Sequence, residues 1–212
     1  MKKRLSIDNP FFEFMGRLGD MLFLNVLFLV CSLPVVTAGA SLAALYQSFD
    51  DMAEGKFISA FRNFTSAWRK NLKTGTKAWM FVLLSGLLLV FELTFVGSMR
   101  RGANAAWGMI GVGIGCLLVV WEMVFCYIFP VILKGETQIK GMIQKSLYLA
   151  VRNFHYTILM AVMNLIPAVC FVLGGRVLAA VLPLYLTFGF AFAAFVQTFF
   201  LRKCIWMNEN GL

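Results

Sequence analysis

The chain has 212 residues, of which 60% are hydrophobic and 14% charged, with 19 basic residues against 10 acidic ones. Soluble domains carry nearer a quarter of charged residues, and one core of this size cannot enclose so much apolar surface. The composition excludes an ordinary soluble domain. It predicts an all-α, polytopic transmembrane bundle, with residues 1–212 as one domain in contact with the lipid bilayer.

The first apolar stretch, residues 21–49, is too long for one upright span and is broken near its middle. At about 1.5 Å per residue it would measure about 43 Å, whereas the hydrocarbon core is about 30 Å thick. Pro34 disrupts the helix, Thr37 is placed to cap a new helix from the next residue, and Gly39 follows. We expect a broken hairpin, each piece of it short of a full crossing, or a kinked span. In the hairpin, the freed backbone and the Thr37 hydroxyl would be buried in protein. A kink that only suits packing is the alternative.

Four later segments are each expected to cross the membrane once. They are residues 78–96, 107–133, 156–173 and 177–201, and a tight turn at residues 174–176 joins the last two. Trp79 and Trp107 begin the first two of these spans, where aromatic side chains commonly anchor a helix at the membrane interface.

Two amphipathic segments carry many of the basic residues. In residues 56–77, aromatic side chains recur at helical spacing with cations on the opposite face, and residues 139–154 form a weaker copy. Such a helix lies in the headgroup plane, as a plain anchor, which we prefer, or as a docking site for a cytoplasmic partner. The order of interfacial helix, span and span then occurs twice, as a weak parallel repeat. The candidate docking residues are Phe61, Phe64, Trp68, Arg69 and Arg152.

The positions of Lys and Arg predict the orientation. If residues 21–49 return to the side where they began, 16 basic residues face one side and 3 the other; a single crossing gives 12 and 7. The positive-inside rule favours the first arrangement, with both termini cytoplasmic in a multi-pass cell-membrane protein. A cleaved signal peptide is disfavoured because about twenty residues precede the apolar run. Nucleic-acid binding is disfavoured because the basic residues are dispersed.

Two acidic side chains fall within the expected spans. Glu92 lies near a span end, within reach of water or of Arg100, whereas Glu122 lies deeper and suits either structural hydrogen bonding or proton or ion handling. Other polar residues in apolar runs are expected to form interhelical hydrogen bonds; these are Asn25, Asn164 and Gln197.

Close helix packing is the expected role of Gly111-x-x-x-Gly115. This spacing lets another helix approach, either within the chain, which we prefer, or in a dimer.

Catalytic and metal-binding motifs are missing from the sequence. It contains no P-loop, dinucleotide fingerprint, zincin motif or nucleophile elbow. The five cysteines include no Cys-x-x-Cys pair, and the one histidine has no second ligand at a suitable spacing. We therefore predict no enzyme activity, no catalytic residues, no cofactor and no metal.

The run Asn25 … Ser32-Leu33-Pro34-Val35-Val36-Thr37-Ala38-Gly39-Ala40 … Ala44-Leu45-Tyr46, with the Phe-rich basic segment 61–71, resembles the YesL-like family of bacterial integral membrane proteins (domain of unknown function 624). Size and hydropathy are similar over nearly the whole chain, and Leu-Pro-Val-Val-Thr-Ala-Gly is the specific part. The family has no assigned activity, and its genes often lie beside carbohydrate uptake transporters.

That resemblance implies a non-enzymatic accessory subunit, with the permease subunits of a carbohydrate ABC importer as partners. The alternative is an autonomous small transporter or channel that uses the helix break and Glu122. The candidate functional or structural residues are Asn25, Pro34, Thr37, Gly39 and Glu122. The resemblance adds no site residue, and the sequence leaves the substrate and the oligomeric state open.

Overall fold

The computed structural model describes residues 10–99 and 105–202, and all regular structure within these ranges is helical. This result confirms the predicted all-α class. In chain order the elements are α1 (Pro10–Ser32), the 3-10 turn η1 (Val35–Thr37), α2 (Ala38–Ala53), α3 (Ala60–Met99), α4 (Ala105–Leu133), α5 (Ile139–Arg152), α6 (Phe154–Leu173), α7 (Gly175–Leu184), the π-helical turn η3 (Tyr185–Gly189) and α8 (Phe190–Leu201).

The helices have the length and apolar surface of a multi-pass membrane protein. Four segments are long and apolar enough to cross a membrane: Met15–Ser32, Ala60–Ser98, Trp107–Leu133 and Val181–Leu201. The pair α5 and α6, bent by 110°, makes a fifth if it is one span. Large apolar side chains lie exposed along these helices, as lipid contact requires.

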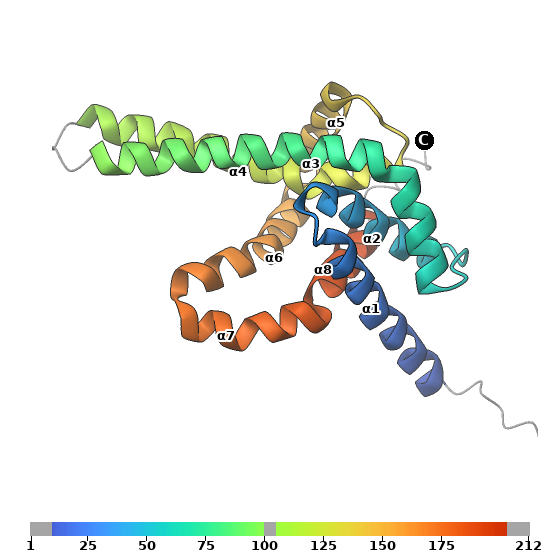
Figure 1. The fold of residues 1–212 in the computed structure, drawn as a ribbon. Coiled ribbons are helices and arrows are strands. Elements are labelled where there is room, and N and C mark those ends of the chain that lie inside the picture. Colours follow the sequence, from blue (N-terminus) through green and yellow to red (C-terminus); the bar gives the residue numbers. More distant parts are fainter. Residues whose placement is uncertain (1–9, 100–104, 203–212) are drawn as a thin grey trace, which may run out of the picture.

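Two long arms extend from a common centre (Figure 1). Helices α3 and α4 pack antiparallel as one helical hairpin, and α6 and α7 form a second hairpin. Helices α1, α2 and α8 meet the bases of both arms. The core lies at this junction and includes the fully buried side chains of Leu24, Phe49, Phe64, Tyr127 and Ile128.

Helix α1, which precedes the break, is longer than we predicted from the apolar stretch alone. Helix α1 begins at Pro10, a residue suited to the first turn of a helix, and has 23 residues. At about 1.5 Å per residue it is about 34 Å long, enough to cross the hydrocarbon core. The expectation that this piece falls short of a crossing was therefore wrong, because polar residues upstream of residue 21 continue the helix.

The structure joins residues 60–77 of the amphipathic segment and the span 78–96 into one helix, α3, of 40 residues. No proline interrupts the sequence at the expected boundary. Figure 1 shows the first turns of α3 at an angle to the rest of the helix. The amphipathic part is therefore the first portion of α3 and not a separate helix, and its buried side packs on α2.

The expected span 177–201 is divided into α7, η3 and α8. Pro183 lies near the end of α7 and has no N–H to donate to the preceding turn. The π-helical turn follows directly, so this segment is bent rather than straight (Figure 1). Gly174, with φ +107°, makes the reversal before α7.

Candidate functional site

Two glycines, Gly39 of α2 and Gly75 of α3, lie at a close contact between these helices. A Cβ atom on Gly75 would lie 2.8 Å from Ala40 Cα and 3.0 Å from Ala40 N. One on Gly39 would overlap with the Gly75 carbonyl oxygen and with Trp79. Only glycine permits this approach, so the site begins with two backbones held together.

Side-chain hydrogen bonds continue the α2–α3 contact toward the loop that joins the helices. Asn71, which is buried, donates to Gln47 at 2.9 Å, and Asn63 donates to Asp51 at 3.0 Å. Helix α2 and the first half of α3 therefore form one unit, which we call the α2–α3 hairpin.

The helix break lies at the surface and not within the bundle as predicted. Leu33 and Val35 are exposed, and η1 has no buried residue. The new helix does begin at Ala38, but the Thr37 hydroxyl makes no capping bond to it. That hydroxyl donates instead to the carbonyls of Cys31 at 2.7 Å and Pro34 at 2.9 Å. The freed backbone is thus satisfied locally, which removes the need for burial in protein.

Asn25 holds the π-helical turn against α1. Its side chain is fully buried; Nδ2 donates to the Leu186 carbonyl at 2.6 Å, and Oδ1 accepts from the Ala191 N–H at 2.9 Å. A π-turn shifts the helical register, and Asn25 supplies partners for two backbone groups beside it. This is an interhelical role of the kind expected from the sequence.

A chain of polar side chains crosses the centre of the bundle. The Tyr46 hydroxyl of α2 donates to Gln197 of α8. Gln197 donates to Asn164 Oδ1 of α6 at 2.8 Å, and the Asn164 amide lies 3.5 Å from Cys126 Sγ of α4. The Cys126 thiol in turn contacts Glu122 Oε1 at 3.8 Å. Four helices are thereby linked, and Glu122 is the one charged group in this chain of contacts.

The second intramembrane acid does not join this network. Glu92 is half-buried on α3, and the structure gives it no ion pair within residues 10–99 and 105–202. Its expected partner, Arg100, lies outside the described residues. Glu92 and Glu122 therefore form no paired-carboxylate site in the described structure.

A cavity of about 200 Å³ lies beside the polar chain, and we call it the central cavity. Its wall includes Tyr46, Asn164 and Gln197. Trp79 also lines it, with its ring 6.3 Å from that of Phe129. The Trp79 indole N–H is buried and has no hydrogen-bond partner in the described structure. The central cavity is therefore lined by aromatic side chains together with members of the polar chain.

The predicted docking residues of α3 differ in burial. Phe64 is fully buried, Trp68 is half-buried and Phe61 is 59% exposed. The stripe turned to α2 contains instead the small residues and Asn71; its members are Ala60, Phe64, Ala67, Asn71, Gly75 and Ala78.

Four of the five cations of α3 define its outer side. Arg62, Arg69, Lys70 and Lys73 are exposed, and none forms an ion pair within the described residues. Arg152 at the end of α5 is also exposed, and its guanidinium donates to the Tyr148 hydroxyl at 3.3 Å. We call the four α3 cations the cationic face.

An ion-pair cluster joins the end of α8 to the end of α2. Arg202 Nη1 lies 2.5 Å from Asp50 Oδ1 and 3.3 Å from Glu54 Oε1. Burial raises the pKa of the Asp50 carboxyl, and the Arg202 guanidinium offsets part of that rise. The two chain segments are thus fixed together through a half-buried carboxylate.

Because the pKa of Asp50 is raised in the folded chain above its ordinary 3.8, ionising it costs stability as the pH rises above that value. The Arg202→Gln variant lacks the compensating cation. We expect its loss of thermal stability, relative to wild type in detergent, to be larger at about pH 7 than at about pH 4. An equal loss at both pH values would show that Arg202 acts by packing alone.

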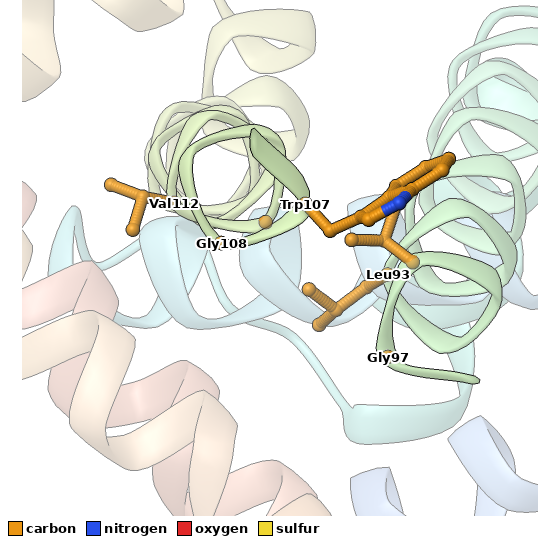
Figure 2. A pocket seen from close by; sticks show the side chains of 7 residues that line it. Leu93, Gly97, Trp107, Gly108 and Val112 are labelled. Atoms are coloured by element: carbon orange, nitrogen blue, oxygen red, sulfur yellow. The ribbon is translucent and has the colours of Figure 1, made fainter. Parts of the chain in front are cut away.

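The glycines Gly111 and Gly115 of α4 lie near a groove at the outer end of the α3–α4 arm. Figure 2 shows Trp107 and Leu93 on one side of this groove, and its volume is about 240 Å³. A Cβ atom on Gly111 would meet Val96 at 3.7 Å, whereas one on Gly115 would meet nothing within 4 Å. Packing within the chain therefore explains the glycine at position 111 but not the one at position 115.

Residues 21–93 match the family model described as "Protein of unknown function, DUF624". This match supports a relationship between the chain and the DUF624 family. The matched range contains the helix break, the α2–α3 hairpin, Asn25 and Trp79, whereas most residues that line the central cavity lie outside it. No curated protein and no solved structure matches the chain.

Proposed function

We propose that this protein is a non-enzymatic accessory subunit of a bacterial carbohydrate ABC importer, to which it binds through the cationic face of α3. The cationic face is the observation that supports a role in docking to a partner protein rather than a role as a plain membrane anchor. Four cations point outward without acidic partners in the described residues, while the opposite side of the same helix is fixed to α2 through Gly39 and Gly75. A rigid row of unpaired cations suits an acidic protein surface.

The identity of the partner comes from the resemblance of residues 25–71 to the YesL-like family. That resemblance also underlies the bacterial cell membrane as the location. Cytoplasmic placement of the cationic face follows from the positive-inside rule.

Co-purification in mild detergent tests this proposal. We expect the permease subunits of an ABC importer to be recovered with wild-type protein, and several-fold less to be recovered with the Arg69→Glu, Lys73→Glu double variant. Lys56→Glu is the matched control, because Lys56 is exposed but already paired with Glu54 at 2.6 Å. Recovery of no importer subunit with wild type, or of equal amounts with the double variant, would contradict the proposal.

The central cavity favours a second candidate function, an autonomous small transporter. The cavity adjoins the polar chain that ends at Glu122, an intramembrane acid of the kind that serves ion or proton coupling. If the protein is such a transporter, we expect purified protein in liposomes to sustain solute flux, and we expect the Glu122→Gln variant to abolish that flux. Absence of flux from liposomes that contain only this protein would argue against it.

A further inference from the structure

Helix α5 meets α6 at a sharp bend, and a basic side chain lies at this bend. The two helices are inclined by 110°, and only Asn153 separates them. Because α6 is the apolar helix of the pair, its passage through lipid leaves α5 roughly parallel to the membrane surface. Arg152, the last residue of α5, therefore lies where headgroups meet hydrocarbon.

Large apolar side chains are exposed on both sides of the bend. Tyr148 and Val151 of α5 are exposed, and so are Phe154 and Ile158 of α6. The opposite side of α5 packs on α4, so these side chains face away from the rest of the protein. An exposed apolar surface of this kind, with a basic residue at its edge, suits contact with lipid at the membrane interface.

The Arg152 guanidinium is exposed and has donors to offer to an anion. It donates to the Tyr148 hydroxyl at 3.3 Å and forms no ion pair with any residue that the structure describes. A guanidinium carries five N–H donors, so most of them are not used by this bond. The Tyr148 hydroxyl therefore holds the side chain without neutralising its charge.

No acidic side chain of α5 or α6 competes for Arg152, since neither helix contains Asp or Glu. Glu136, just before α5, is paired with Lys145 at 2.6 Å. Lys140 of α5 is exposed and has no ion pair among the described residues. The bend is thus complementary to an anionic phospholipid, whose phosphate suits the guanidinium and whose acyl chains suit the apolar side chains.

We propose that the α5–α6 bend is a binding site for an anionic phospholipid of the surrounding leaflet. Arg152 binds the headgroup phosphate, the Tyr148 hydroxyl holds the guanidinium in place, and the acyl chains lie against Phe154 and Ile158. This inference goes beyond the proposed docking function, because it concerns α5 and α6 and requires no partner protein.

Quenching of a fluorophore by brominated lipids tests the site in the full chain. A bimane label is attached to Ile158→Cys in a background without the native cysteines, in vesicles of equal parts phosphatidylglycerol and phosphatidylcholine. Only one of the two lipids carries brominated chains in each preparation. We expect stronger quenching when phosphatidylglycerol is brominated, corresponding to a roughly fivefold preference, the effect of one basic residue at an anionic surface. Added inorganic phosphate should leave this preference in place, because it has no acyl chains to contact α6.

Arg152→Gln is expected to remove the preference, and Lys145→Gln is the matched control. Both remove one positive charge from α5, but Lys145 is already paired with Glu136, so its variant should keep the preference. A second label at Leu88→Cys, exposed farther along the α3–α4 arm, checks that each variant is inserted in lipid and should show no preference.

Three results would overturn the proposal. The first is equal quenching by the two lipids at position 158 when Arg152 is intact, or the same preference at position 88 as at position 158. The second is a loss of preference in Lys145→Gln as large as that in Arg152→Gln. The third is abolition of the preference by inorganic phosphate, which would show that the bend binds a free anion and not a lipid.

Discussion

The Gly39→Ala variant is expected to lose roughly 1–3 kcal/mol of stability, the usual cost of overpacking a tight helix contact. The added Cβ would overlap with the backbone oxygen of Gly75 and with Trp79. Backbone cannot rotate away as a flexible side chain can, so α2 and α3 must separate. Thermal denaturation of the purified protein in detergent, followed by the loss of the monodisperse peak, measures the effect.

Gly113→Ala provides the control for this experiment. Gly113 is also within a helix, but a Cβ there would meet nothing within 4 Å. Because alanine favours helix over glycine by up to about 1 kcal/mol, this variant should be as stable as wild type or slightly more so. Equal stability of the two variants would disprove the close α2–α3 contact.

The second large effect is expected at Asn25. Asn25→Ala removes the partners of the Leu186 carbonyl and the Ala191 N–H, both beside the π-helical turn. An unsatisfied buried polar group costs about 1–3 kcal/mol, so the midpoint of thermal denaturation should fall clearly and α8 should loosen from α1.

Limited proteolysis after residue 184 offers a second measurement of the Asn25→Ala variant, since a loosened π-turn exposes this segment. Val26→Ala is the neighbouring control, because Val26 is 52% exposed and contributes little to the core. If both variants denature and are cleaved like wild type, Asn25 does not hold the turn.

Local sequence signals predicted the features that depend on local backbone chemistry. Pro34 and Thr37 predicted a helix beginning at Ala38, which the structure shows. Long apolar runs predicted helices of membrane-spanning length, because burying the backbone in lipid requires internal hydrogen bonds. The four α3 cations were placed on one side by helical spacing alone, and they lie exposed in the fold.

The sequence did not reveal contacts between distant helices. Nothing near Gly75 indicates that Gly39 will pack against it, and the polar chain from Tyr46 to Cys126 joins residues far apart in the sequence. Trp79 had the position of an interface anchor but lines the central cavity. The aromatic spacing of α3 did not indicate that a stripe of small residues beside Phe64 would allow the approach of α2.

Labelling of single cysteines with a membrane-impermeant maleimide, in a background without the native cysteines, tests the multi-pass arrangement most directly. Ser59→Cys precedes α3 and Thr137→Cys precedes α5, and both positions are exposed. We expect both to be modified from the cytoplasmic side only, and Ser98→Cys, at the far end of α3, from the outer side only. Modification of positions 59 and 137 from opposite sides would contradict the account.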